Sequence, residues 1–494
     1  MVVAFLRMSA PLRNRLPRLY ADQVSQSNRS VKGFGWKPGR GGLPRRSHRS
    51  AHEKPVAELV VPRPFPPSEA QMKKMILLSA LTLLTTAAAQ TSLSGTVTVW
   101  SWDVAAKALQ STIPGFNKQY PNVKVEVVDL GNQNVYDRGL AGCAAGGADL
   151  PDVYSIENNE AEVFWARFPD CFTDLNTLGA DKLVKNFPAF KWTELTANNK
   201  RYAMPWDSGP VVIFYRRDLY QQAGINPAAI RTWDDFLAAG KKLNTKFGNK
   251  VKIATIANGQ DDEWFRMLAN QNGCFYFNNA ATQVTIAQPG CVTALSTIKK
   301  LNDAQVLATG DWGGQITGIK ASKAASAIYG AWYEGTIRTN APDQKGKWGV
   351  YLMPASKAGG PRAANLGGSA LALPASSKNK AAAFAFMQYA LGTAQGQVAM
   401  LKGEGLVPSL LSATKDPYVA QGQAYWGNQK VWQTILGTLG DVPQARGTQY
   451  FQDARQIMIV VQADYLKGKY KTAQEALNDA AKKISSATGL AVAK

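Results

Sequence analysis

The chain has 494 residues and a formal net charge of +21, with 18% of its residues charged. The charge is unevenly distributed: residues 1–71 hold 13 basic and 4 acidic side chains, whereas residues 90–494 hold 41 basic and 31 acidic side chains. This distribution disfavours a nucleic-acid role for the main part of the chain. The only histidines are His48 and His52. The rest of the chain therefore lacks the base of a Ser-His-Asp mechanism and the usual ligands of a catalytic zinc or iron site. Glycoside hydrolysis by carboxyl groups is still compatible with the composition.

Residues 72–89 have the pattern of a secretory signal peptide. Lys73 and Lys74 precede an apolar run over 75–84, and three alanines at 87–89 fit the small-residue cleavage rule. The run is shorter than the roughly 20 residues that span a bilayer. No cysteine stands at the cleavage region to receive a lipid. The pattern predicts export to the periplasm, without a lipid anchor.

Residues 1–71 precede this signal and are rich in Arg, Pro, Ser and Gly, with no helix or strand period. Such a composition is typical of disorder. We interpret the segment as lying upstream of a natural start at Met72, with a genuine basic extension as the alternative, and leave it out of the predicted fold.

An α/β lobe is predicted from residue 95 onward. Strand patterns at 96–100, 122–128 and 152–156 alternate with helical patterns, and strand–helix–strand repeats of this kind are typical of parallel sheets with right-handed crossovers. A second α/β unit follows, because about 400 residues exceed a single hydrophobic core. Its predicted strands are 211–215 and 251–256, and its predicted helices start after the N-cap Thr232 and cover 262–270 and 292–301. Beyond this unit, further strands are predicted at 327–330, 348–352 and 370–373. The last 115 residues are predicted to be mainly helical, including 449–466 and 471–486.

Four cysteines, Cys143, Cys171, Cys274 and Cys291, lie in the exported part of the chain. An even number in an oxidising compartment favours disulfides, and no short paired spacing for a zinc site is present. Three pairings are possible. We favour Cys143–Cys171 and Cys274–Cys291, because each pair lies in one local region and closes a modest loop.

Aromatic side chains recur where predicted strands end, which is where open α/β sheets bind ligands. Flat indole faces suit the apolar face of a pyranose, and carboxylates and amides bind its hydroxyls. The candidates of this kind are Trp102, Trp206, Trp264, Trp332 and Tyr333, with the polar residues Asp103, Glu157, Asn158, Asp207, Asp261 and Glu334. Other tryptophans are expected in the core, namely Trp100, Trp165, Trp348 and Trp432.

An ordered series of motifs resembles the family 1 extracellular solute-binding proteins, the maltose-binding-like receptors of ABC importers. The series spans about 96–490 and no single motif in it is decisive. Its members are GTVTVWSWD at 95–103, FNKQYPNVKV at 116–125, GADLPDVY at 147–154, YAMPWD at 202–207, FYRRDLY at 214–220, TWDDF at 232–236, AIYGAW at 327–332, GVYLMP at 349–354, and Gly367-Gly368 followed by 382–391.

The resemblance implies a two-lobe periplasmic-binding-protein fold of type II, each lobe a mainly parallel sheet flanked by helices. Residues 95–206 and about 348–395 are expected in lobe one, and about 207–347 and about 396–494 in lobe two. A carbohydrate would bind in the cleft and be delivered to the membrane permease, with no catalysis, no cofactor or metal, no nucleic acid, and a monomeric protein. Carried over by position, the ligand-binding residues are Trp102, Asp103, Glu157, Asn158, Trp206, Asp207, Trp264, Trp332, Tyr333, Glu334, Gly367, Gly368 and, as the weakest match, Tyr450. The four cysteines depart from the common pattern of the family.

Two alternatives stay open at this point. The same receptor role is compatible with a polyamine, a peptide or an anion, since Asp103, Glu157 and Asp207 also suit a cation. A secreted glycoside hydrolase is also compatible, but it needs two carboxyl groups about 5–9.5 Å apart, and no pair in the sequence stands out for that role.

Overall fold

The computed structural model describes residues 93–443 and 447–494, all of which belong to one compact unit of the chain, 70–494. The predicted signal peptide at 72–89 and the segment 1–71 lie outside the described residues. Buried apolar side chains form two separate cores, and we call the two parts built around them lobe one and lobe two.

Lobe one is built on a five-stranded sheet in the order β2-β1-β3-β14-β6. The strands β1 (Gly95–Ser101), β2 (Val123–Asp129) and β3 (Val153–Glu157) are parallel, as the sequence predicts, and α2 (Asp103–Gln119) and α3 (Asn132–Ala144) connect them. Alternate residues of β1, Val97 and Val99, are fully buried, so one face of this strand packs into the core.

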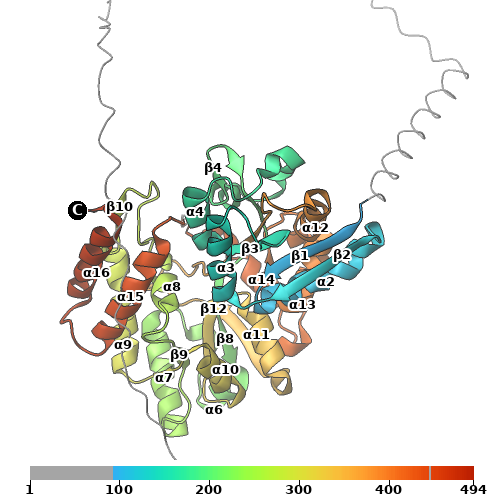
Figure 1. Ribbon diagram of the computed structural model, residues 1–494. Helices are drawn as coiled ribbons and strands as arrows, with labels where there is room; N and C mark the ends of the chain where they lie inside the picture. Colours follow the sequence, from blue (N-terminus) through green and yellow to red (C-terminus); the bar gives the residue numbers. More distant parts are fainter. Residues whose placement is uncertain (1–92, 444–446) are drawn as a thin grey trace, which may run out of the picture. The chain divides into compact units, whose positions relative to one another are not determined.

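A segment from much later in the chain completes lobe one. The strand β14 (Ser369–Ala372) inserts between β3 and β6 (Ala203–Pro205) and is antiparallel to both. The helices α12 (Lys380–Gly392) and α13 (Ala394–Glu404) then pack against α2, and Figure 1 shows them in orange beside the blue β1 and α2. Phe116 of α2 meets Phe386 of α12 edge-on, with 5.4 Å between ring centroids.

Lobe two has a three-stranded antiparallel sheet in which β8 (Val211–Arg216) lies between β12 (Ser326–Gly330) and β13 (Trp348–Leu352). Two short pairs of described strands there are parallel, β9 (Ala254–Ile256) with β11 (Leu307–Thr309) and β10 (Gln283–Val284) with β16 (Ala491–Val492), but the larger sheet is antiparallel, so the expectation of a mainly parallel sheet does not hold for lobe two. Helices surround these strands: α6 (Arg217–Gln222), α7 (Trp233–Phe247), α8 (Glu263–Gln271), α9 (Pro289–Asp303), α10 (Trp312–Lys320), α11 (Tyr333–Asn340), α14 (Val431–Leu436), α15 (Phe451–Leu466) and α16 (Ala473–Thr488).

The remaining described α-helices and strands are short. They are α4 (Asn158–Arg167), α5 (Ala189–Thr193), the hairpin of β4 (Thr196–Ala197) and β5 (Lys200–Arg201), the pair β7 (Asp207–Ser208) and β15 (Val407–Pro408), and the pair β10 (Gln283–Val284) and β16 (Ala491–Val492). None of the helices that the structure describes is both long and apolar enough to cross a membrane.

The boundaries between the lobes differ from the expected ones. Trp348 of β13 is fully buried in the core of lobe two, so the chain returns to lobe one only at β14, about 20 residues later than expected. Leu410 and Ala413 still belong to the core of lobe one, although the second crossing was expected near residue 396. A buried strand pattern does not reveal which of two sheets it joins, and this explains both differences.

Local signals in the sequence explain several element ends. Thr232 caps α7 with a capping box: its Oγ1 accepts from Asp235 N at 3.2 Å, and Asp235 Oδ2 accepts from Thr232 N at 2.9 Å. Gly248 ends the same helix in the left-handed conformation. Both predicted disulfides are present, Cys143–Cys171 and Cys274–Cys291, each with 5.4 Å between Cα atoms.

Candidate ligand-binding cleft

A cleft of about 520 Å3 lies between the two lobes. Its size falls within the range of about 300–1,000 Å3 that is typical of small-molecule sites. Lobe one contributes Trp102, Asp103, Asn132, Gln133, Glu157, Asn159, Glu160 and Asp207, lobe two contributes Asp261, Glu263, Arg266, Trp312, Trp332, Phe451, Gln452 and Arg455, and the connecting segment contributes 366–369.

The lobe-one wall stands at the carboxyl ends of its parallel strands. Trp102 and Asp103 follow β1 directly, and Glu157 ends β3. The Trp102 ring packs on Tyr136, with 5.9 Å between centroids. Asp103 has a φ of 38°, in the left-handed region that is costly for a residue with a Cβ. Burial raises the pKa of Asp103, against the opposing effect of Lys107, whose Nζ lies 3.9 Å from its carboxylate.

The aromatic part of the lobe-two wall is a pair of tryptophans. The rings of Trp312 and Trp332 lie 6.1 Å apart, with 32° between their planes. Trp332 Nε1 donates to the carbonyl oxygen of Leu366 at 2.9 Å, which fixes its ring against the connecting segment. Trp312 is 38% exposed. Trp312 was absent from the predicted site, although its position just after β11, at the start of α10, is the same kind of strand-end position that selected Trp332.

Two arginines and two aspartates form a charge cluster beside this wall. Arg455 Nη2 lies 2.6 Å from Asp261 Oδ2, and Arg266 Nε donates to Asp262 Oδ1 at 2.8 Å. Arg266 and Arg455 also reach the other aspartate at 3.6 Å each. The side chain of Asp262 is completely buried, and burial raises its pKa despite the neighbouring guanidinium groups. The two arginines also act on the neighbouring carboxyl groups of the cleft, whose pKa values they lower against the effect of burial.

Three of those other carboxyl groups are desolvated. Burial, reinforced by the charge of Glu157, raises the pKa of Glu160 to about 7, and burial together with Asp261 raises the pKa of Glu263 to about 8. Burial also raises the pKa of Glu157, against the opposing effect of Arg266. Glu160 Oε1 accepts a hydrogen bond of 2.6 Å from Gln452 Nε2, and this bond joins α4 of lobe one to α15 of lobe two.

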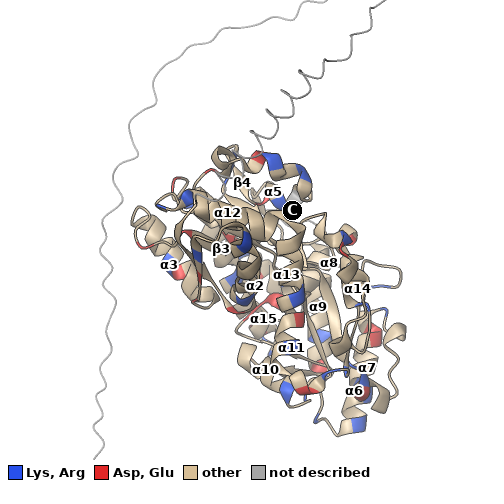
Figure 2. Cartoon of the chain, turned by 90° about the vertical axis from the view of Figure 1, so that its right-hand side faces the viewer, with Lys and Arg blue, Asp and Glu red and all other residues tan. Residues whose placement is uncertain are grey.

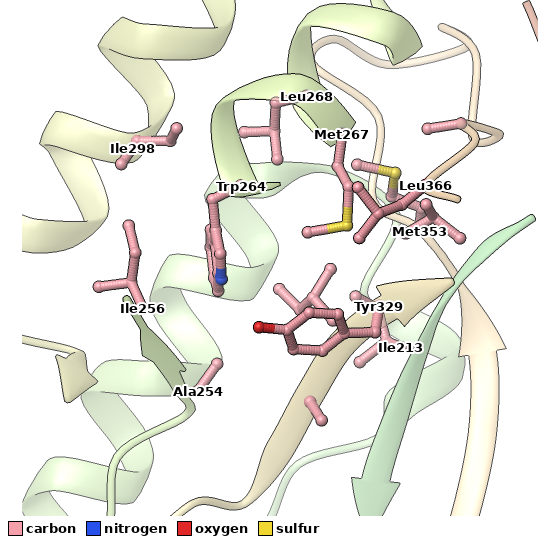
Figure 3. Packing of buried hydrophobic residues seen from close by; sticks show 14 of the residues in the cluster. Ile213, Ala254, Ile256, Trp264, Met267, Leu268, Ile298, Tyr329, Met353 and Leu366 are labelled. Carbon is pink, nitrogen blue, oxygen red and sulfur yellow. The ribbon is translucent and has the colours of Figure 1, made fainter. Parts of the chain in front are cut away.

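Five of the predicted ligand-binding residues, besides Asn158, do not line the cleft. Trp264 is 2% exposed and lies in the core of lobe two, where Figure 3 shows it between Ile256 and Tyr329. Trp206 is buried in lobe one, and its Nε1 donates to the sulfur of Met400 at 3.1 Å. The others are Tyr333 in the core of lobe two, Glu334, which accepts from Trp426 Nε1 at 2.7 Å, and Tyr450, whose ring packs on Phe277.

The periodicity of helices and strands explains these differences. Trp206 lies between β6 and β7, and successive side chains of extended backbone point to opposite sides, so Asp207 lines the cleft whereas Trp206 enters the core. Successive helix residues diverge by about 100°, so Glu263 at the start of α8 lines the cleft whereas Trp264 does not. Choosing the wrong member of such a pair shifts the predicted site by one residue.

The remaining predicted residues lie near the connecting segment. Gly367 and Gly368 line the cleft with φ angles of 86° and 103°, which favour glycine. Asn158 lies just behind the cleft, where its Oδ1 accepts from Lys191 Nζ at 3.1 Å. Within 93–443 and 447–494, no group of three or more His, Cys, Asp or Glu side chains has an arrangement that would hold a metal ion.

Comparison with known proteins places this geometry in context. The family model described as "Bacterial extracellular solute-binding protein" matches residues 101–397. A lactose-binding protein of Rhizobium radiobacter is 29% identical over 375 residues, which are 74% of this chain and 87% of that protein. An arabinooligosaccharide-binding protein of Bacillus subtilis is 26% identical over 436 residues, 83% of this chain and 99% of that protein.

Solved structures agree with the two-lobe fold. A binding protein associated with an ABC transporter of B. animalis subsp. lactis Bl-04, solved with beta-1,6-galactobiose, superposes with a TM-score of 0.69. It is 24% identical and covers 81% of this chain and 100% of its own. Because the family model covers more than half of the residues, the chain belongs to the bacterial extracellular solute-binding proteins.

Proposed function

We propose that the protein is an exported receptor that binds a carbohydrate between its two lobes and delivers it to the permease of an ABC importer. The observation that supports this most directly is the composition of the cleft, in which the Trp312–Trp332 pair of lobe two shares one cavity with carboxylates of both lobes. Indole faces contact the apolar face of a sugar ring, and carboxylates accept hydrogen bonds from its hydroxyl groups. The relatives named for lactose and arabinooligosaccharide binding support the same ligand class.

The receptor role includes no catalysis, no cofactor and no nucleic-acid partner, and the protein acts as a monomer. In the view of Figure 2, Lys and Arg positions are interspersed with Asp and Glu positions along the described elements. The receptor works outside the cytoplasmic membrane, in the periplasm, after cleavage of the signal peptide and without a lipid anchor.

The test is a titration of the purified protein with mono-, di- and oligosaccharides, followed by tryptophan fluorescence and by the melting temperature. A ligand present at 100 times its Kd adds about 2.7 kcal/mol to the free energy of unfolding. Chromatography of the sugar after incubation shows whether it is intact. Saturable binding of an intact sugar is expected. Cleaved sugar would indicate a glycoside hydrolase, and binding of putrescine or a peptide without sugar binding would indicate a receptor for another solute.

A further inference from the structure

A hydrogen bond between two side chains joins the lobes across the cleft. Glu160 lies in the first turn of α4, and its Oε1 accepts from Gln452 Nε2 of α15 at 2.6 Å. Both side chains line the cleft. Since α4 packs in lobe one and α15 in lobe two, this bond exists only while the two lobes are close together. We call the pair Glu160–Gln452 the interlobe latch.

The glutamate of the latch is shielded from water. Glu160 is 5% exposed, and its Oε1 also accepts from Asn159 Nδ2 at 3.3 Å. Both donors, from Gln452 and Asn159, are neutral amide groups. Removal of a carboxylate from water is costly, and a hydrogen bond from a neutral amide offsets this cost less than a bond from a cation does. A carboxyl group in such surroundings favours its neutral, protonated form.

Both lobes place ionisable groups next to Glu160. These groups are Glu157 at the end of β3, Tyr136 of α3 and Tyr154 of β3 in lobe one, and Arg266 of α8 and Arg455 of α15 in lobe two. Burial and the charge of Glu157 raise the pKa of Glu160, whereas the bond from Gln452 and the two arginines lower it, and the balance is a pKa of about 7. The assembled site therefore favours the protonated form of Glu160 on balance.

The surroundings of Glu160 are complete only when the lobes are together. Separation of α4 from α15 would break the latch and admit water to Glu160, and the pKa of Glu160 would then fall toward its ordinary value of 4.5. The approach of the lobes therefore takes up a proton at Glu160 wherever the pH lies between these two pKa values. Glu263 differs, because the residues that act on it all belong to lobe two, namely Asp261, Asp262, Arg266 and Tyr329. The titration of Glu263 is therefore less sensitive to the position of lobe one.

We propose that Glu160 is a positioning residue whose protonated side chain holds lobe two through Gln452, so that capture of the ligand is coupled to the uptake of a proton. This inference rests on the proposed carbohydrate receptor, in which the two lobes enclose the sugar. A low pH favours the enclosed state, and a higher pH favours release of the sugar. Because the latch joins the lobes to each other, its pH dependence is the same for every saccharide that the cleft encloses.

The first part of the test measures affinity against pH by isothermal titration calorimetry. The probes are lactose, arabinotriose and maltotriose, at pH 6, 7 and 8. The Kd of the unmodified protein should rise about tenfold from pH 6 to pH 8, by the same factor for each saccharide that binds. Glu160→Gln keeps the oxygen that accepts from Gln452 but does not titrate, so its Kd should change less than about twofold over this range. Glu126→Gln is the matched control, because it removes the same charge from an exposed ion pair with Lys124, and it should keep the pH dependence of the unmodified protein.

The second part counts protons and reverses the latch. Titrations at pH 7 in phosphate and in Tris, whose enthalpies of ionisation differ, give the number of protons taken up for each sugar bound. The unmodified protein should take up about half a proton more than Glu160→Gln. Gln452→Glu places a second carboxyl group opposite the first, so the bond persists while one of them is protonated and becomes repulsive when both are ionised. Its affinity should therefore fall more steeply with pH than that of the unmodified protein.

The outcomes separate the latch from the receptor. If Glu160→Gln does not fold, Gln452→Glu decides the question. An affinity that does not change with pH, or a pH dependence that Glu160→Gln retains, would overturn the latch and leave the carbohydrate receptor intact. A pH dependence that Glu160→Gln loses but that differs from one saccharide to the next would show direct contact of Glu160 with the sugar, which also overturns the latch. Failure of every saccharide in the panel to bind would overturn the proposed function and the latch together.

Discussion

The indole rings of Trp312 and Trp332 share one wall of the cleft, 6.1 Å apart and 32° from parallel. They come from different elements, since Trp312 begins α10 and Trp332 directly precedes α11. Trp332 is tied to the backbone of Leu366, whereas Trp312 is held mainly by ring contacts with Tyr329, Tyr333 and Trp332. Trp312 therefore offers an exposed aromatic face whose removal should perturb the fold little.

Replacing Trp312 with Ala should weaken carbohydrate binding at least tenfold, which corresponds to about 1.4 kcal/mol. The melting temperature should fall less than that of a Trp264→Ala variant, because the Trp312 side chain is 38% exposed whereas that of Trp264 is 2% exposed. Fluorescence or calorimetric titration measures the first effect and a thermal scan the second. An unchanged affinity would remove the stacking argument for the proposed ligand class.

Replacing Trp264 with Ala should have the opposite profile. This side chain is buried in the core of lobe two, and removal of a buried Trp lowers the free energy of unfolding by about 3–5 kcal/mol. Urea denaturation should show this loss, while the sugar affinity of the folded fraction should stay within a factor of about three. A large loss of sugar affinity without a loss of stability would instead indicate that Trp264 contacts the ligand.

The buried charge cluster should be sensitive to the loss of either arginine. Arg266→Met removes the 2.8 Å partner of Asp262, whose side chain is completely buried, and breaking a buried pair in this way costs about 3–5 kcal/mol. Lys300→Met is the control, because its ion pair with Asp234 is exposed, and such pairs contribute less than about 1 kcal/mol. Similar stabilities of the two variants in urea would contradict this account.

The stability should decrease as pH rises through neutrality. The pKa of Glu160 is raised to about 7 in the folded protein, so its protonated form is favoured by folding. The contribution of Glu160 to the free energy of unfolding is complete below the ordinary pKa of a glutamate, near 4.5, and is lost as pH rises through about 7. Glu263, with a pKa of about 8, acts in the same direction. Glu160→Gln keeps the oxygen that accepts from Gln452 but does not titrate.

Measurements of unfolding in urea at pH 5, 6, 7 and 8 test this effect. Between pH 5 and 8 the unmodified protein should lose on the order of 1–3 kcal/mol more than the Glu160→Gln variant. Parallel pH profiles for the two proteins would show that Glu160 is ionised normally in the folded state.

The disulfide of lobe two should be needed for stability. Cys274 lines a cavity of about 120 Å3 beside the cleft, and its bridge to Cys291 closes a loop with a sequence separation of 17. A double Cys274→Ala, Cys291→Ala variant should lose about 3 kcal/mol, because its unfolded chain regains the entropy of the open loop. Thermal unfolding under non-reducing conditions measures the loss, and an unchanged melting temperature would assign the bridge another role.

Most of the fold could be predicted from the sequence, because its signals are local. The alternation at 96–100 and 122–128 and the capping sequence at Thr232 each identify an element within one or two residues. The disulfides followed from sequence proximity. The sequence did not reveal to which lobe β13 belongs, because its pattern of buried residues fits either sheet. Only its pairing with β8 places it in lobe two.

The cleft was harder to predict than the fold. Asp103, Glu157, Asp207, Asp261 and Trp332 do line it, because strand ends gather there. Glu160, Arg266 and Arg455 were missed, since a charged residue on a helix has the same appearance in the sequence whether it faces solvent or another lobe. The smaller cavity beside the cleft, of about 120 Å3, gives no sequence signal, because the residues that line it, from Asn158 to Phe451, come together only through the packing of the two lobes.

The position of β14 determines when lobe one is able to fold. Its residues Ser369–Ala372 lie between β3 and β6 in the sheet. A chain that has been synthesised only as far as residue 206 therefore lacks the strand that joins β3 to β6. During synthesis, which begins at the N-terminus, more than 160 further residues must follow β6 before β14 is made. Until then, the edges of β3 and β6 that face β14 in the folded protein have no native partner strand. The three-stranded sheet of lobe two ends at Leu352. All of its strands are therefore synthesised before β14, the last strand of the lobe-one sheet. The three-stranded sheet of lobe two can therefore be complete, during synthesis, before the sheet of lobe one.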